Sequence, residues 1–241
     1  MTNMDNKLYL VPALLGDYEP GTVIPTPVLE KLREIRIFVV EELRTARRYL
    51  SQAGLKGHIA ELEFHELNEH SDQASVEALS ELFERGDVAM ISEAGLPAVA
   101  DPGAKLVALC HRHGIKVVPL VGPSSMMLAL MGSGLNGQNF EFCGYLPAKT
   151  GERRSKLKDI EKIVDATGKS HIFIETPYRN DSLLEDFVSV CRSETLLCVA
   201  ADITTADEFI LTLTAGQWRA RLKEGFRIGK RPCVFIMGRW F

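Results

Sequence analysis

Small residues and a single carboxylate follow one apolar run in a pattern that suits ligand binding. Residues 92–97 read SEAGLP and come directly after VAMI at 88–91, with DPG at 101–103 ahead of a helical stretch. In a parallel sheet, ligands bind where the strands end, and the N-terminus of the following helix offers free N–H groups to a carboxylate. The loop is neither G-x-G-x-x-G nor a P-loop, because no Gly-Lys-Ser/Thr follows. A turn that only connects a strand to a helix remains the alternative.

A second candidate lies in the stretch PLVGPSS at 119–125, where two prolines and one glycine indicate a connector. We place a domain boundary here, between an N-terminal domain of residues 1–119 and a C-terminal domain of residues 120–241. Ligands often bind where two domains meet. The hydroxyls of Ser124 and Ser125 also suit the N-cap of a helix, which is the commoner role for serine at such a place.

Two polar motifs carry further candidates for chemistry. HELNEH at 65–70 is not the zinc motif H-E-x-x-H, because its histidines are five residues apart. On a helix their rings would point about 140° apart, so no metal site is expected. Asn68 and Glu69 within it suit contacts to a substrate, or simply a solvated loop. ETPYR at 175–179 closes an apolar run and opens a helix, where its glutamate and arginine also suit a plain ion pair.

The charge balance restricts how the chain could bind nucleic acid. It has 28 basic and 32 acidic residues, a formal net charge of −4, whereas proteins that hold nucleic acid by bulk charge are basic. RNA or DNA would therefore contact local patches only. Two such patches are KTGERRSKLK at 149–158, with net charge +4, and RARLKEGFRIGKR at 219–231, with net charge +5. Solvated helix faces and loops are the alternative explanation for both.

Composition indicates a globular protein with a substantial core. Of the 241 residues, 46% are hydrophobic and 25% are charged, and no apolar run approaches the roughly 20 residues that cross a membrane. The first residues lack the basic and apolar regions of a signal peptide. The five cysteines are odd in number and scattered, which favours reduced thiols over a disulfide framework or a zinc site. We therefore expect a cytoplasmic protein that binds neither membrane nor metal.

The order of the apolar runs predicts an α/β protein. In the first half we expect strands at 7–11, 35–40, 88–91 and 115–118, and helices at 74–85 and 103–113. In the second half we expect strands at 140–145, 171–175, 196–200, 208–214 and 233–238. Strand–helix–strand units of this size imply parallel pairing with right-handed crossovers. The strand, short helix and strand over 208–238 predict some antiparallel pairing as well.

Taken together, the motifs resemble the tetrapyrrole-methylase-like superfamily of S-adenosylmethionine-dependent methyltransferases. Within it the chain is most similar to the bacterial 16S ribosomal RNA cytidine 2′-O-methyltransferases. The matching stretches, in order, are LYLVPALLGD at 8–17, EELR at 41–44, HELNE at 65–69, ISEAGLPAVADPG at 91–103, VVPLVGPSSMMLALMGSGL at 117–135, FCGYLPAK at 142–149, ERRSKLK at 152–158 and FIETPYR at 173–179.

The resemblance implies an enzyme of two α/β domains with S-adenosylmethionine in the cleft between them, usually as a homodimer. A bound donor needs in-line alignment with its acceptor, and a ribose hydroxyl also needs a proton acceptor. Residues expected at the cofactor are Pro12, Ser92, Glu93, Ala94, Gly95, Pro97, Ala100, Gly122, Ser124, Ser125 and Tyr145. Candidates for substrate or acid–base roles are Glu41, Asn68, Glu69, Glu175, Tyr178 and Arg179, with Asp17 behind them. Arg44, Arg153 and Arg154 suit phosphate contacts to ribosomal RNA.

The chain also departs from the family pattern. The family's Asp-Ala-Gly-Thr-Pro stands here as EAGLP at 93–97, and its Ala-Arg-Glu-Leu-Thr-Lys as AADITT at 200–205, so the arginine and lysine expected at 201 and 205 are absent. Many relatives also carry a small C-terminal helical domain, which we do not expect here. Three functions therefore stay open: a ribose methyltransferase acting on RNA, a methyltransferase acting on a tetrapyrrole or another small molecule, and a cofactor-binding protein that has lost catalysis.

Overall fold

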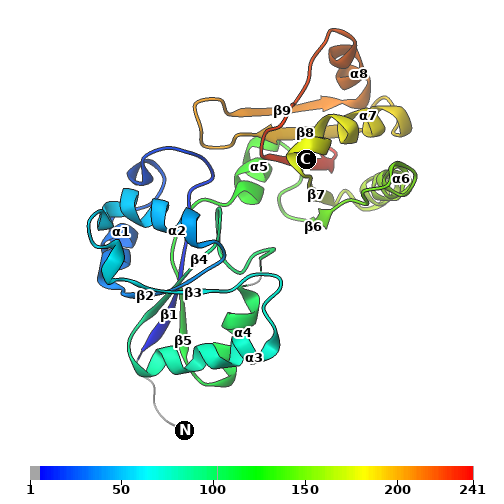
Figure 1. Ribbon diagram of the computed structural model, residues 1–241. Helices are drawn as coiled ribbons and strands as arrows, with labels where there is room; N and C mark the ends of the chain where they lie inside the picture. The colour runs from blue at the N-terminus through cyan, green and yellow to red at the C-terminus, as the bar shows by residue number, and fades with distance from the viewer. Residues whose placement is uncertain (1–5, 102, 241) are drawn as a thin grey trace. The chain divides into compact units, whose positions relative to one another are not determined.

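The computed structural model describes residues 6–101 and 103–240. We predicted that the first residues of the chain do not form a signal peptide. Residues 1–5 lie outside the described range. The chain divides into two compact units, Met1–Ser124 and Ser125–Phe241, which we call unit 1 and unit 2. The division falls within the connector at 119–125. Figure 1 gives the element labels used below.

Unit 1 is built on a sheet of five parallel strands. They are β1 (Lys7–Val11), β2 (Ile37–Val40), β3 (Glu63–Glu66), β4 (Val88–Ile91) and β5 (Lys116–Pro119), in the order β3-β2-β4-β1-β5. The predicted parallel pairing is thus confirmed. The sequence prediction did not include β3, whose residues EFHE form no apolar run.

Helices cover both faces of this sheet, as Figure 1 shows, with α1 (Thr26–Glu34) and α2 (Leu43–Leu50) on one face. On the other face lie α3 (Gln73–Ala78) and α4 (Ala104–Arg112). Alternate strand residues divide between the two cores: Tyr9 and Val11 pack on one side, and Leu8 packs on the other.

The single helix predicted over 74–85 is wrong in its second half. There α3 gives way to a 3-10 helix, Leu79–Glu84. Leu79 and Leu82 are both buried, and their spacing of three matches the three residues per turn of that helix.

Unit 2 contains a second five-stranded sheet, in which most pairs are antiparallel. Its strands are β6 (Phe140–Tyr145), β7 (Ser170–Ile174), β8 (Leu196–Ala201), β9 (Phe209–Thr214) and β10 (Cys233–Gly238), in the order β6-β7-β10-β8-β9. Only β6 and β7 are parallel. This arrangement confirms the prediction of antiparallel pairing in the second half.

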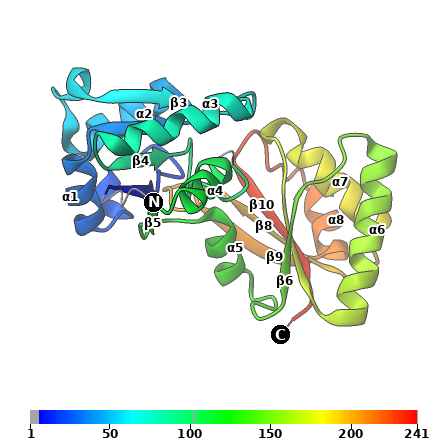
Figure 2. The ribbon, with the colours of Figure 1, turned by 90° about the horizontal axis from the view of Figure 1, so that it is seen from below.

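The two faces of this sheet carry different helices, as Figure 2 shows. The helices α6 (Thr150–Thr167), α7 (Asn180–Val190) and α8 (Ala215–Lys223) cover one face. Trp218 of α8 is fully buried there and donates from its ring nitrogen to the carbonyl of Leu197. The helix α5 (Ser125–Ser133) packs on the opposite face against β8, β9 and β10.

All five cysteines are free thiols, and four of them are buried. No helix within residues 6–101 and 103–240 combines the length and the apolar character that crossing a bilayer requires.

Candidate functional site

The parallel sheet of unit 1 brings most of the predicted residues of that unit to one edge. Because all five strands run the same way, their carboxyl ends lie together. Val11, Ile91 and Val40 are register partners across β1, β4 and β2. The residues that follow these and the remaining two strands include Pro12, Glu41, Asn68, Glu69, Ser92 and Gly122.

Three of the loops at this edge are joined to one another. The N–H of Ala13 donates to the carbonyl of Gly95 at 2.8 Å, which links the loops after β1 and β4. Gly122, after β5, lies so close to Pro12 that an added Cβ would sit 2.2 Å from the Cβ of the proline. The buried hydroxyl of Tyr49 donates to the carbonyl of Pro12 at 2.8 Å. The edge is therefore a preformed cluster of loops rather than a set of independent turns.

The loop after β4 has an unusual backbone. Gly95, Ala98 and Ala100 all have positive φ, at 71°, 67° and 59°. For alanine this conformation costs about 1 kcal/mol or more, and such strain concentrates at functional sites. Pro97 is buried in the same loop, whereas Ala100 is exposed.

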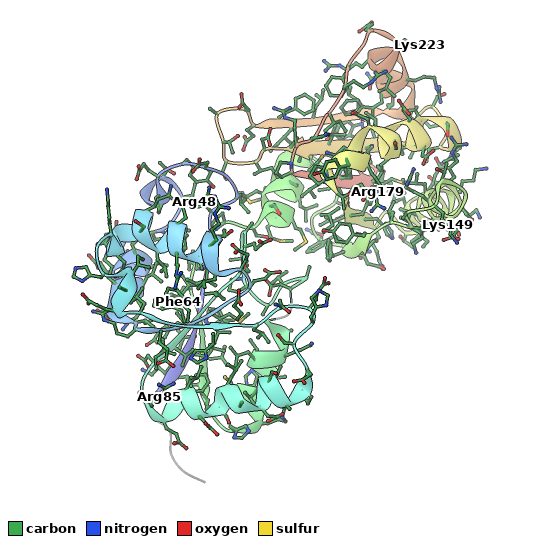
Figure 3. The ribbon with its side chains drawn as sticks, in the orientation of Figure 1. Arg48, Phe64, Arg85, Lys149, Arg179 and Lys223 are labelled. Carbon is green, nitrogen blue, oxygen red and sulfur yellow. The ribbon has the colours of Figure 1, made fainter. Side chains whose placement is uncertain are left out.

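A cavity of about 220 Å³ opens beside these loops in unit 1. Ser92, Glu93 and Ala94 line it as predicted cofactor residues, and Asp17 lines it as well. The remaining lining comes from residues 13–16, from Ile91, and from one face of α2 and the turn that follows: Thr45, Ala46, Arg48, Tyr49 and Gln52. Sequence reasoning missed the α2 face, although its members recur at the three- and four-residue spacing of one helical side. Figure 3 labels Arg48 on this helix.

Glu41 connects the end of β2 to the loop after β4. Its Oε2 accepts the N–H of Glu93 at 3.2 Å. Burial is the main cause that raises the pKa of Glu41, and the nearby charges of Asp101 and Glu93 add to it, while the N–H of Glu93 opposes the shift. A carboxyl group with a raised pKa takes up a proton more readily than an ordinary glutamate.

The motif at 65–70 forms a strand end and a turn instead of a helix, so the 140° argument does not apply to it. His65 lies on β3, with its Nε2 2.6 Å from Oε1 of Glu63. Asn68 accepts the N–H of His70 through its side-chain oxygen, which commits that oxygen to the turn, and Glu69 is exposed. Across the described residues, no group of three or more His, Cys, Asp or Glu side chains could hold a metal ion.

In unit 2, Glu175 and Tyr145 lie at the carboxyl ends of β7 and β6, which are neighbours. Glu175 is buried, and its Oε1 accepts the N–H of Thr176 at 2.7 Å and two bonds from Arg179 at 2.8 and 2.6 Å. The structure thus contains the plain ion pair that the sequence of this motif left open. Tyr145 and Tyr178 are exposed by 61% and 78%.

Comparison with known proteins identifies the family. The sequence model described as "Tetrapyrrole (Corrin/Porphyrin) Methylases" matches residues 7–218. The chain belongs to the tetrapyrrole methylase family. It is therefore a methyltransferase, as its motifs predict, and the methyl donor of this family is S-adenosylmethionine.

Curated relatives in the family share about a third of their residues with this chain. "Ribosomal RNA small subunit methyltransferase I" of Escherichia coli O157:H7 is 33% identical over 236 residues, which is 98% of this chain and 78% of that protein. The protein of the same name from Neisseria meningitidis serogroup B is 35% identical over 230 residues, covering 95% and 75% of the two chains.

Solved structures confirm the fold at much lower identity. The methyltransferase CobJ aligns with a TM-score of 0.63 at 15% identity, over 98% of this chain and 95% of that chain. A diphthine synthase aligns with a TM-score of 0.64 at 15% identity, over 97% and 90%. A uroporphyrin-III C-methyltransferase from Thermus thermophilus, in complex with S-adenosylhomocysteine, aligns with a TM-score of 0.58 at 17% identity, over 97% and 98%. The predicted two-domain tetrapyrrole methylase fold is thus confirmed.

One predicted phosphate contact of this methylase is wrong. Arg153 is buried at 2% exposure; its Nε donates to Oδ2 of Asp186 at 2.7 Å, and its Nη1 donates to the carbonyl of Ala148. Charge counting missed Asp186, which is far away in the sequence. Arg154 also donates to Asp186, at 2.6 Å, but about half of its side chain is exposed. Arg44, in the first turn of α2, is exposed.

Of the positions where the methylase lacks the expected arginine and lysine, 201 is at the end of β8 and 205 is in the turn that follows. Ala201 is the last residue of the strand, and Asp202 and Thr204 follow with positive φ. Arg231, which precedes β10, donates from Nε to Oδ2 of Asp202 at 2.5 Å. A guanidinium from a different part of the chain therefore lies next to position 201.

Proposed function

We propose that this methyltransferase transfers the methyl group of S-adenosylmethionine to a ribose 2′-hydroxyl of small-subunit ribosomal RNA. The joined loops at the carboxyl edge of unit 1, with their cavity, are the observation that supports a donor site. The choice of RNA as the substrate rests on the relatives, whose names state ribosomal RNA of the small subunit. The structural similarity to the tetrapyrrole enzymes comes with low sequence identity, so it supports the fold alone.

The residues of the loop cluster suit this donor. Its methionine part carries an ammonium and a carboxylate, and the cavity has Glu93 and Asp17 for the first and Arg48 for the second. We propose that Gly95, Pro97 and Gly122 keep the backbone of these loops close to the donor. The further residues that we propose at the donor are Ala100, Ser124, Ser125 and Tyr145. When bound, S-adenosylmethionine supplies a methyl group already activated by its sulfonium centre.

We propose Glu41 as the residue that accepts the proton of the ribose hydroxyl. Its raised pKa suits proton uptake, whereas Oε1 of the alternative, Glu175, is already occupied by three N–H donors. We assign Glu175 and Arg179 to positioning the turn at 175–179. Asn68 and Glu69 are proposed as substrate contacts.

The phosphate contacts are proposed for exposed cations. Arg44 and Arg154 keep this role, and the exposed Lys158, four residues after Arg154 on the same face of α6, takes the place of Arg153. Lys149, labelled in Figure 3, precedes this helix and forms an ion pair with Glu152.

We also propose that the chain acts as a homodimer in the cytoplasm. Met127 and Met131, one helical turn apart on α5, are 39% and 79% exposed, and such apolar side chains suit a subunit contact. Sedimentation at micromolar concentration should give twice the mass of one chain, and Met131→Glu should reduce it to that of one chain. Cell fractionation tests the location.

Transfer of labelled methyl groups to small-subunit ribosomal RNA tests the proposed function. The purified protein, S-adenosylmethionine and unmethylated small subunits should yield one labelled nucleotide. The phosphodiester bond 3′ to it should resist alkali, because alkaline cleavage requires a free 2′-hydroxyl. Glu41→Gln should lower kcat while leaving the affinity for S-adenosylhomocysteine within about threefold. Label on a base, or none in RNA while a tetrapyrrole is methylated, would refute the proposal.

A further inference from the structure

An aromatic ring stands out on the surface of unit 2. Tyr178 is 78% exposed, whereas Phe173, Phe187, Trp218 and Phe235 of the same unit are fully buried. It lies in the middle of a 3-10 turn, Pro177–Arg179, which is separated from β7 by Glu175 and Thr176.

Hydrogen bonds of Arg179 fix the turn that carries Tyr178. Arg179 donates its N–H to the carbonyl of Thr176 at 2.9 Å, and its side chain reaches back to the buried Glu175. Pro177 fixes its own backbone φ. A ring on so rigid a base loses little conformational freedom when a ligand stacks on it.

A cation from a distant segment lies over the ring. Nζ of Lys230 is 5.0 Å from the centroid of Tyr178, within the range of cation–π contact. The segment around Lys230 is fastened to the start of α7. Asn180 donates to the carbonyls of Gly229 and Arg231, and Asp181 accepts the N–H of Ile228 at 2.7 Å.

Lys230 supplies positive charge at the ring. It is exposed and belongs to the basic stretch at 219–231. The carboxylate of Asp181 is engaged by backbone N–H groups, and that of Asp202 by Arg231. A cation next to an exposed ring suits a polyanion with flat bases, because a phosphate can pair with the cation and a base can stack on the ring.

Two buried acceptors flank the same turn. Oε2 of Glu175 and Oδ1 of Asn180 have no hydrogen-bond partner among the residues that the structure describes. Buried acceptors are normally paired, so the hydrogen bonding beneath Tyr178 is incomplete. Both oxygens are closed off from solvent, so an RNA strand on the surface would not reach them, and the site rests on the exposed ring and the cation beside it.

We infer that Tyr178 and Lys230 form a binding site for an unpaired nucleotide of the RNA substrate, with the base stacked on the tyrosine ring and a phosphate beside Lys230. This inference rests on the proposed function. It makes Tyr178 a substrate-binding residue and leaves proton transfer to other groups. An unpaired strand is required, because bases inside a duplex cannot expose a face to the ring.

The test measures binding of a fluorescent single-stranded oligoribonucleotide of twelve residues, and of the same strand in a duplex. Tyr178→Ala should weaken single-strand binding by about 5- to 100-fold, the usual loss for one stacked base. Tyr178→Phe should stay within about twofold, because it keeps the ring. Lys230→Ala should lower the log–log salt slope by about one unit.

A matched control is Trp240→Ala, which removes another exposed ring of unit 2, at 60% exposure, and should leave binding unchanged. The affinity for S-adenosylhomocysteine should not change in any variant. If Tyr178→Ala binds the single strand within twofold of wild type, or weakens the duplex as strongly as the single strand, the inference is wrong. Wild-type protein that methylates ribosomal RNA in that case leaves the proposed function standing; wild-type protein that neither binds nor methylates RNA refutes both.

Discussion

The buried arginine of α6 offers a sharp test of how the fold uses its charges. Arg153 and Arg154 are neighbours in the sequence and share one acceptor, Asp186. The side chain of Arg153 is 3% exposed and that of Asp186 is 4% exposed, whereas that of Arg154 is 48% exposed. Replacing each arginine by alanine therefore removes the same charge from two different environments.

The expected losses of stability differ several-fold. Removing one partner of a buried ion pair costs about 3–5 kcal/mol, because the other charge is left without compensation. Asp186 keeps Arg154 in the Arg153→Ala variant, so we expect about 3 kcal/mol, at the lower end of that range. A half-exposed pair is screened by water, so Arg154→Ala should cost about 1 kcal/mol or less.

Tryptophan fluorescence during urea unfolding measures the difference. The chain has two tryptophans, Trp218 and Trp240, and both lie in unit 2, so the signal reports on the unit that contains Arg153. At a slope of about 2 kcal/mol per molar urea, Arg153→Ala should lower the midpoint by about 1.5 M, and Arg154→Ala by about 0.5 M or less.

Equal midpoint shifts for the two variants would refute this reasoning. So would an Arg153→Ala protein with wild-type stability and a reduced salt slope for RNA, because Arg153 would then be a phosphate contact. Arg153→Lys serves as the conservative control. It keeps the charge but loses the forked geometry, so its midpoint should fall between those of wild type and Arg153→Ala.

Gly122→Ala should lower the thermal midpoint of unit 1 and weaken binding of S-adenosylhomocysteine, since the new Cβ would lie 2.2 Å from the Cβ of Pro12; calorimetry measures both, and an unchanged midpoint contradicts the close contact. Because the folded-state pKa of Glu41 is raised, its contribution to stability is complete below its ordinary value of 4.5 and is lost as the pH rises through the raised value. Glu41→Gln should therefore raise the thermal midpoint at pH 7.5 but not at pH 4, and the opposite pattern would contradict the sign of the shift. Cys143 is the one cysteine that is not buried, so Ellman's reagent should find one fast thiol in the native protein and five after unfolding.

Local pattern was enough to find most of the elements that build the edge of unit 1. The strand Val88–Ile91 is a continuous apolar run of four between polar residues, and a run too short for a buried helix favours a buried strand. Alternation of such strands with helices implies parallel pairing, and parallel pairing places the following loops at one edge. The loop at 92–97 and the turn at Gly122 are therefore recognisable from residue types and order alone.

Local pattern failed where pairing, not periodicity, determines the structure. The strand Glu63–Glu66 has the sequence EFHE and is a strand because β2 lies beside it. The α2 face at the cavity carries ordinary helix residues, and only the position of the loops beside it makes this face part of a site.

The charged residues show most clearly what local sequence pattern could not predict. Arg153 and Arg154 have the same charge and adjacent positions, and the sequence predicts one role for both. On the helix they point about 100° apart, and only the packing of α7 against α6 places Asp186 where it buries one and leaves the other half exposed. In the same way, Lys230 lies over Tyr178 only because Asn180 fastens a distant segment to the start of α7. Burial of apolar residues is encoded in local periodicity, whereas the partner of a charge depends on which faces the completed fold brings together.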